Sequence, residues 1–278
     1  MTANEAPRAD GGTGRARPPG FDISVANQAR MYDYLLGGKD NYAADRAAIE
    51  AQLEIYPDLA FAALANRAFL GRAVRYLAGG AGIRQFLDIG TGIPTAGNTH
   101  QVAQDIAPES RVVYVDYDPI VLAHARALLV SHEAGATDYI DADLRDTGTI
   151  LAQASELLDF SEPVAVTLVA ILHAIPDSDD PHGKVARLMD AVPPGSYLAI
   201  SHMGTGLLDR ETQHGLESHS DRMMQQRLTA RSREQVAGFF EGMDLVPPGV
   251  VRVDEWRQES GAGGAGNSAL WGAVGRKR

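Results

Sequence analysis

The sequence predicts an α/β fold with a Rossmann-like, doubly wound sheet, preceded by a helical N-terminal region. From residue 83 onward, short apolar stretches alternate with longer amphipathic ones, which is typical of a parallel sheet covered by helices on both faces. The first apolar stretch ends in Asp88-Ile89-Gly90-Thr91-Gly92, a glycine turn that lets a ligand approach the backbone closely. The chain of 278 residues, with 45% hydrophobic residues, is long enough to bury a substantial core.

The N-terminal part divides into a tail and a helical cap. Residues 1–20 are rich in Gly, Pro, Ala and Arg without periodicity, so we expect a disordered tail. Residues 21–82 carry helical patterns that are interrupted at Gly37-Gly38 and at Pro57, and the last helix is expected to end at Gly79-Gly80. The spacing in this last helix predicts a core-facing side made of Phe61, Leu64, Ala68, Leu70, Val74 and Leu77.

Residues 83–278 form the predicted sheet domain. The pattern predicts strands at 84–89, 112–115, 138–140, 164–169 and 197–201, and helices at 98–106, 120–131, 149–158, 183–191 and 231–240. Two further strands, at 249–253 and 269–274, flank a Gly/Ser-rich segment and are expected to close the sheet as an antiparallel pair. The polar insertion at about 204–228 resembles neither a strand nor an amphipathic helix, and we expect it to cover the active site.

Composition excludes several functional classes. The chain has no cysteine, which excludes disulfides, thiolate nucleophiles and cysteine-based zinc sites. Its formal net charge of −11 argues against a nucleic-acid surface. Apolar runs stay well below the roughly 20 residues of a membrane span, and the N-terminus lacks a secretory pattern. We therefore expect a cytoplasmic protein that acts on a small molecule, without a membrane, nucleic-acid or metal partner.

The ends of successive predicted strands carry groups that suit a nucleoside. The turn at Asp88 fits a plain strand-to-helix connection equally well when taken alone. Asp116, at the end of the next strand, can accept hydrogen bonds from both hydroxyls of a ribose, and the adjacent Tyr117 can lie flat on an adenine. At the following strand end, Asp143 can accept a hydrogen bond from an adenine amino group while Leu144 packs on the ring. Because the carboxyl ends of parallel strands meet at one edge, these groups together favour a nucleoside site.

A nicotinamide or flavin site is the competing interpretation of the glycine turn. Its fingerprint, G-x-G-x-x-G, requires a glycine where this chain has Thr95. An acid two residues before the first glycine, Asp88 here, is also not part of that fingerprint. We therefore treat this interpretation as the less favoured one.

Five sequence blocks together resemble one enzyme family. They are Ala29–Tyr42 (ARMYDYLLGGKDNY), Asp88–Thr95, Val115–Pro119, Asp143–Asp146 and Leu172–Asp177. On these blocks the chain resembles the class I S-adenosylmethionine-dependent methyltransferases, and within them the actinobacterial S-adenosyl methyltransferase group (Methyltransf_19, formerly DUF574). The resemblance implies a seven-stranded sheet with an antiparallel last strand, S-adenosyl-L-methionine as cofactor, and methyl transfer to an unidentified small molecule.

The resemblance also implies roles for individual residues. The turn from Asp88 to Gly92 would wrap the methionine part of the cofactor, Asp116 would hold the ribose, and Asp143 with Leu144 would hold the adenine. The block before the first strand is expected to fold over the strand ends as a lid, with Tyr32 and Asp33 contacting the sulfonium and its amino-acid tail. The full expected cofactor site is Tyr32, Asp33, Asp88, Gly90, Thr91, Gly92, Asp116, Tyr117, Asp143, Leu144 and Ala170.

The catalytic assignment depends on the acceptor. If the acceptor must lose a proton, His173 or Tyr32 is the predicted base; a histidine at a strand end that only hydrogen-bonds backbone is equally common. Two other functions stay open on the sequence: a non-catalytic protein that binds S-adenosylmethionine or S-adenosylhomocysteine, and an NAD-dependent oxidoreductase. An enclosed acceptor pocket would favour the enzyme.

Overall fold

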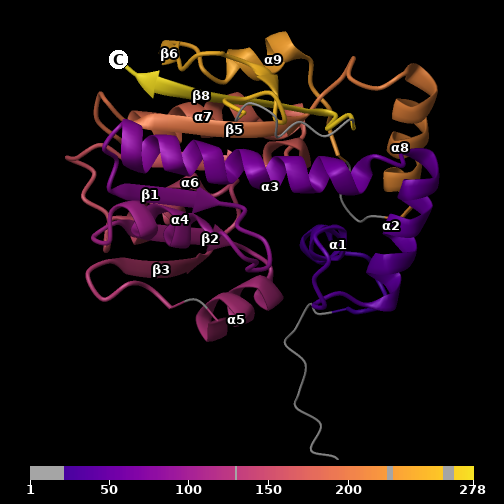
Figure 1. Cartoon of the computed structure of the whole chain (residues 1–278), viewed down its shortest axis with the longest axis horizontal. Helices are drawn as coiled ribbons and strands as arrows, with labels where there is room; N and C mark the ends of the chain where they lie inside the picture. Colours follow the sequence, from indigo (N-terminus) through magenta and orange to yellow (C-terminus); the bar gives the residue numbers. More distant parts are fainter. Residues whose placement is uncertain (1–21, 129, 224–227, 259–265) are drawn as a thin grey trace, which may run out of the picture.

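The chain folds around one mixed sheet, which Figure 1 shows with its helices in the computed structural model. The structure describes residues 22–128, 130–223, 228–258 and 266–278. The tail expected at 1–20 and most of the glycine-rich segment at 260–268 therefore lie outside the described residues. The strands are β1 (Gln85–Ile89), β2 (Arg111–Asp116), β3 (Ala136–Asp141), β4 (Ala165–Val169), β5 (Tyr197–Met203), β6 (Met243–Leu245), β7 (Val251–Arg252) and β8 (Leu270–Lys277).

The strand order is β3-β2-β1-β4-β5-β8-β6, with the short β7 also paired to β8. Strands β1 to β5 run parallel, whereas β8 is antiparallel to β5. The expected doubly wound sheet with an antiparallel last strand is thus confirmed. The chain leaves β1 toward β2 on one side and returns to β4 on the other, so the order reverses between β1 and β4. Ligands of such sheets bind at this switch point.

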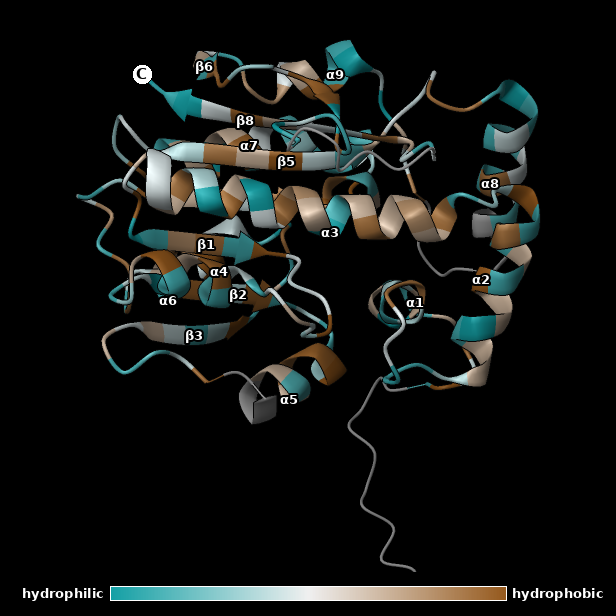
Figure 2. Cartoon of the chain, viewed as in Figure 1, coloured by the Kyte–Doolittle hydropathy of each residue, from teal (hydrophilic) through white to brown (hydrophobic). Residues whose placement is uncertain are grey.

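Helices cover both faces of the sheet because neighbouring strand residues point to opposite sides. Phe86 and Val112 pack with Phe69 and Leu77 from the N-terminal side of the chain. Leu87, Val113 and Val166 instead pack with the helices that follow β3 and β4. Figure 2 shows hydrophobic, brown stretches within β1 and β5, as this two-sided burial requires.

The helices are α1 (Gln28–Leu35), α2 (Ala43–Ile55), α3 (Leu59–Arg75), α4 (Thr99–Ile106), α5 (Pro119–Leu128), α6 (Thr147–Ala154), α7 (Pro181–Asp190), α8 (Arg210–Met223) and α9 (Arg233–Gly238). Short turns of helix lie at Tyr76–Gly80, Leu172–Ala174 and Asp177–Asp179. Figure 1 shows α1, α2 and α8 grouped at one end of the sheet, while α3 runs across it. Within the described residues, no helix has both the length and the apolar character needed to cross a bilayer.

Two local expectations were wrong. In α3, Leu64 is 55% exposed and Ala68 is exposed, because the buried stripe lies one position away, along Ala62, Ala65, Phe69 and Ala73. The insertion at 204–228, expected to be irregular, contains the 14-residue helix α8. The polar composition of this helix gave no apolar periodicity by which to predict it. Its N-terminus is marked by Asp209, which accepts a hydrogen bond from the Thr212 amide at 2.9 Å, as a helix-capping residue does.

Helix α8 packs on α2 rather than on the sheet. A Cβ at Gly215 would lie 2.9 Å from the Cγ2 atom of Ile55, so the two helices approach each other at a glycine. A helix that packs on the sheet needs a continuous apolar stripe. Helix α8 contacts α2 instead, through the close approach at Gly215, and is capped by Asp209.

Candidate functional site

A cavity of about 280 Å³ lies at the switch point of the sheet, between the loops that follow the parallel strands and helices α1, α2, α3 and α8. Every residue that the sequence assigned to the site lines this cavity, with the exception of Asp33. These lining residues are Tyr32, Asp88, Gly90, Thr91, Gly92, Asp116, Tyr117, Asp143, Leu144, Ala170 and His173.

The glycine turn after β1 is shaped by its backbone. Gly90 and Gly92 have φ angles of +77° and +67°, which residues with a Cβ adopt at a cost. The Gly90 amide donates to the Val115 carbonyl at 2.8 Å, which ties the turn to β2. A Cβ on Gly90 would lie 2.6 Å from the Cγ1 atom of Ile171, whereas a Cβ on Gly92 would meet no atom within 4 Å. The side chain of Ile171 therefore occupies the space beside Gly90, whereas the space beside Gly92 is free of protein atoms.

Replacing Gly90 by alanine is expected to destabilise the protein, because strain at positive φ adds to a clash with Ile171. Together these cost about 2–4 kcal/mol. Gly82→Ala is the matched control, since Gly82 has a φ of +72° and open space at the Cβ position. Urea unfolding of both variants measures the difference. Equal losses of stability would show that the contact with Ile171 contributes nothing.

The carboxylate of Asp88 is hydrogen-bonded within the protein. It is buried and accepts hydrogen bonds from the hydroxyls of Thr99 and Thr167, both at 2.7 Å. Burial raises the pKa of this carboxyl, and the two hydroxyls act in the opposite direction. Asp88 thus joins β1 to the start of α4 and to β4, which leaves the backbone of the turn, rather than this carboxylate, to face a ligand.

Asp116 ends β2 and faces the cavity. Its two carboxylate oxygens accept hydrogen bonds from the amides of Gly92 and Asp118, each at 2.9 Å. Burial raises the pKa of Asp116 to about 6, while these amides act to lower it. Asp118 has a different task, because its carboxylate caps α5 through the Ile120 amide at 2.8 Å. Tyr117, between the two acids, is 50% exposed although it lines the cavity.

The loop after β3 presents an ion pair and a buried leucine. Arg145 donates to the two Asp143 oxygens at 3.0 and 3.3 Å, and its Nε lies 2.6 Å from Asp179. Leu144 is 4% exposed and belongs to the main core. Asp143 therefore reaches the cavity as a carboxylate whose charge Arg145 already balances.

His173 lies in the helical turn after β4 and is buried. Its Nε2 atom is 2.9 Å from the amide nitrogen of Gln28, on α1. Burial lowers the pKa of His173 to about 4, and the positive charge of Arg231 acts in the same direction. The imidazole is therefore neutral near neutral pH, and its low pKa makes it a weak proton acceptor.

The Tyr32 hydroxyl is also fully used. It donates to the Ala63 carbonyl at 3.0 Å and accepts from the Asn66 amide at 2.9 Å. Burial raises the pKa of Tyr32 above that of an ordinary phenol. Asn66 in turn accepts from the Ser201 hydroxyl, whose oxygen accepts the Ala170 amide at 2.9 Å. This chain of bonds fixes the hydroxyl of Tyr32, and because its pKa is raised the phenol keeps its proton and is poorly suited to act as a base.

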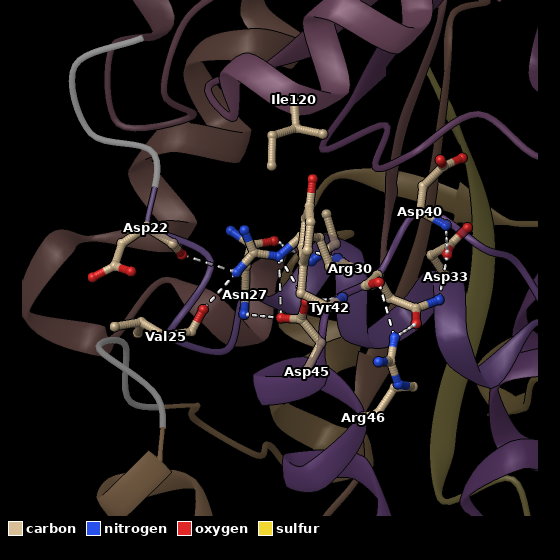
Figure 3. A network of polar contacts seen from close by, with 12 residues as sticks. Asp22, Val25, Asn27, Arg30, Asp33, Asp40, Tyr42, Asp45, Arg46 and Ile120 are labelled. Atoms are coloured by element: carbon tan, nitrogen blue, oxygen red, sulfur yellow. Dashed lines mark hydrogen bonds and ion pairs between the residues drawn. The ribbon is translucent and has the colours of Figure 1, made fainter. Parts of the chain in front are cut away.

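Asp33 does not reach the cavity, in contrast to its expected cofactor contact. Figure 3 shows its carboxylate turned toward the loop that follows α1. It accepts the Asp40 amide and the Asn41 side-chain amide, both at 2.9 Å. A Cβ on Gly38 would lie 2.0 Å from its Oδ1 atom, so Asp33 fills the space that this glycine leaves. Its role in the structure is to shape this loop.

A second cluster in the same segment joins α1 to α2. The buried Arg30 forms an ion pair with Asp45 at 2.9 Å. Asp45 also accepts the amides of Asn27 at 2.9 Å and Tyr42 at 2.8 Å, so one carboxylate satisfies the ends of two helices (Figure 3). Several polar residues of the Ala29–Tyr42 block thus form contacts within the N-terminal cap that hold α1 and α2 together.

Three residues that line or support the site were not singled out by sequence reasoning: Gln28, Arg67 and Arg231. Arg67, on α3, lines the cavity and donates to the Asn98 side chain at 2.8 Å and the Ala96 carbonyl at 3.2 Å. Its Nε is buried without a hydrogen-bond partner, and no carboxylate of the described chain forms an ion pair with it. An arginine in a helix otherwise rich in alanine was the available sequence signal.

Comparisons with known proteins find relatives over nearly the whole chain. A family model described as S-adenosyl methyltransferase matches residues 15–278. A DUF574 family protein from Streptomyces avermitilis has a similar structure, with a TM-score of 0.89 and 44% identity over 92% of this chain and 99% of its own. A protein from Thermobifida fusca, described as a candidate methyltransferase, has a TM-score of 0.85 and 40% identity over 94% of this chain and 98% of its own. The comparison with curated proteins gives no match.

Proposed function

This chain belongs to the S-adenosyl methyltransferase family, and from that premise we propose how its cavity divides between the cofactor and the methyl acceptor. It is an S-adenosyl-L-methionine-dependent methyltransferase. The acceptor that we propose is a small molecule, since the cavity is enclosed by the cap helices α1, α2 and α8. In this proposal α3 belongs to the sheet layer, so the cap is smaller than the 21–82 region that the sequence suggested.

We assign the cofactor to the end of the cavity formed by the strand loops. Asp116 would accept the ribose hydroxyls, Asp143 would receive the adenine amino group, and Leu144 with Tyr117 would enclose the ring. The backbone from Gly90 to Gly92 would follow the methionine part. The observation that carries this assignment is the distribution of charge: carboxylates follow β2 and β3, and Arg67, whose Nε has no hydrogen-bond partner, lies on α3 in the same cavity. Arg67 would hold the carboxylate of the methionine part.

Methyl transfer requires the protein mainly to align the two reactants. When bound, S-adenosyl-L-methionine would supply an electrophilic methyl carbon on a sulfonium: the acceptor would bond to this carbon as the carbon–sulfur bond breaks, and the sulfur would leave as a neutral thioether. The residues of this chain bind the two reactants, hold the nucleophile in line and exclude water, and such positioning supplies several kcal/mol of the barrier. No acid is needed, because the leaving sulfur becomes neutral.

The two predicted bases are better suited to positioning. His173 is neutral with a pKa near 4, and the hydroxyl of Tyr32 is held by two partners. We propose that neither accepts the acceptor's proton. Instead, His173 holds Gln28 and Tyr32 forms the wall between the two ends of the cavity. The acceptor would then be nucleophilic without help from a protein base.

Substitution of Arg67 tests the assignment of the cofactor. Arg67→Met is expected to weaken S-adenosylhomocysteine binding about tenfold or more, because a charge-assisted pair to its carboxylate is lost. Binding of 5′-methylthioadenosine, which lacks the amino-acid part, should change less than about twofold. Calorimetric titration of both ligands gives the ratio, and Arg67→Lys is expected to retain part of the preference. Equal losses for the two ligands, or binding of NAD in their place, would count against the proposal.

A further inference from the structure

The cavity continues beyond the assigned cofactor end, and there its walls are apolar. Partly exposed leucines from the helices and loops, and one methionine at the end of β5, line it without being sealed in the core. They are Leu35, Leu59, Met203, Leu208, Leu216 and Leu228. Binding of an apolar molecule would remove this apolar surface from water, which is favourable.

The charged residues that line the cavity are confined to its cofactor end and its rim. Asp88, Asp116, Asp118 and Asp143 lie at or after strand ends, Arg67 is the residue assigned to the cofactor, and Arg145 is balanced by its ion pairs. Of the described lining residues on the cap helices, Glu217 is the one that carries a charge; it is exposed and accepts a hydrogen bond from Gln213 at 3.0 Å. A charged group on the acceptor would therefore lose water in this part of the cavity without gaining a partner.

Gln28 places a directed polar group among these apolar side chains, in addition to the amides of Gln52 and Gln213, which also line the cavity. Its side-chain nitrogen is 2.9 Å from Nε2 of the buried His173, which fixes the amide from behind. The amide donates to this ring nitrogen, which accepts because the imidazole is neutral. The carbonyl oxygen of the same amide has no hydrogen-bond partner in the described chain and is not among its buried unpaired atoms, so it is accessible on a half-buried side chain that lines the cavity.

We infer that the methyl acceptor is a largely apolar, uncharged molecule that donates one hydrogen bond to the side-chain carbonyl oxygen of Gln28. This inference rests on the proposed function, since it concerns the second end of the same cavity. His173 is a positioning residue here: it holds the amide so that the oxygen points toward the acceptor. An oriented polar group in a largely apolar site selects the orientation of a ligand, because a mismatched ligand leaves that group unpaired.

Three bicyclic probes test this inference. Indole is apolar and carries one N–H donor, benzofuran has the same shape without the donor, and indole-3-carboxylate adds a charge. Each is titrated by ligand-observed magnetic resonance into the full chain, with and without S-adenosylhomocysteine. We expect indole to bind about fivefold more tightly than benzofuran, as one neutral hydrogen bond provides. We expect indole-3-carboxylate to bind at least about tenfold more weakly than indole.

The variants separate Gln28 from the rest of the wall. Gln28→Leu is expected to abolish the preference for indole over benzofuran while S-adenosylhomocysteine binds as before. Gln213→Leu, which removes an amide at the rim, is the matched control and should keep the preference. The inference is overturned if no probe binds, if the preference is missing or survives Gln28→Leu, or if the carboxylate binds as well as indole. Failure of S-adenosylhomocysteine to bind would instead count against the proposed function.

Discussion

Asp116→Ala is expected to weaken S-adenosylhomocysteine binding about 100-fold or more, the largest effect on affinity of any single substitution considered. Two hydrogen bonds from ribose hydroxyls to an ionised carboxylate contribute about 1.5 kcal/mol or more each. Calorimetric titration measures the loss. Because Asp116 also accepts the amides of Gly92 and Asp118, thermal unfolding of the variant must show that the turn still forms. Asp118→Ala is the control for that structural part, since Asp118 caps α5.

The pH dependence of the same affinity provides an independent test. The pKa of Asp116 is raised to about 6 by burial, and the ionised form is the one that accepts two hydrogen bonds. The affinity should therefore fall about tenfold between pH 7 and pH 5. In Asp116→Ala this slope should vanish. A slope that persists in the variant would assign the titration to another group.

The sign of the stability change is opposite to that of the affinity. The folded pKa of Asp116 lies above the ordinary value of 3.8 for an aspartate, so folding favours the protonated carboxyl. Its contribution to stability is fully present below pH 3.8 and is lost as the pH rises through about 6. At neutral pH the protein thus keeps an ionised carboxylate at a cost in stability, as is common for groups that bind a ligand.

Arg231→Leu is expected to lower the free energy of unfolding by about 3–5 kcal/mol, because it removes a buried cation with several partners. The guanidinium is 1% exposed. It donates to the carbonyls of Leu172 at 3.0 Å and Ile175 at 2.9 Å, and it forms an ion pair with Asp177 at 2.6 Å. It also donates to Nε2 of His202 at 2.7 Å. Without it, the carbonyl of Ile175 loses its donor, and that of Leu172 keeps only the Ile175 amide at 3.1 Å.

Arg233→Leu is the matched control for this prediction. Arg233 is exposed and donates to one carbonyl, that of Val250, at 2.7 Å, so its loss should cost about 1 kcal/mol. Arg231→Lys keeps the charge but not the planar fork, and we expect an intermediate loss. Urea unfolding compares the three variants. If Arg231→Leu is no less stable than Arg233→Leu, the guanidinium does not hold the loop.

The parts of the site that could be predicted from sequence are those set by local order. A strand that ends in Asp116 places this acid at the sheet edge whatever the rest of the chain does, and the next strand does the same for Asp143. The positive φ angles at Gly90 and Gly92 follow from the tightness of one turn. These residues therefore lie together in the cavity as expected, and their binding of the cofactor stays a prediction.

The parts that could not be predicted depend on partners far away in the chain. Gln28 and His173 are 145 positions apart, and Arg231 lies 59 positions from the carbonyl of Leu172. Asp33 looked available for a ligand, yet the Asp40 amide and the Asn41 side chain occupy it. Helix α8 lacked an apolar stripe because it packs on α2 at a glycine instead of on the sheet.

By itself the sequence determined the alternation of strands and helices, the glycine turn after β1 and the acids at the strand ends. Each depends on neighbouring residues, through backbone geometry and hydrophobic periodicity. Only the tertiary structure decided which of those acids can still accept a hydrogen bond from a ligand. It also decided that His173 is neutral and that Gln28 and Arg67 line the same cavity. Burial and pairing decide these properties, because a side chain's charge state and free lone pairs depend on what packs around it.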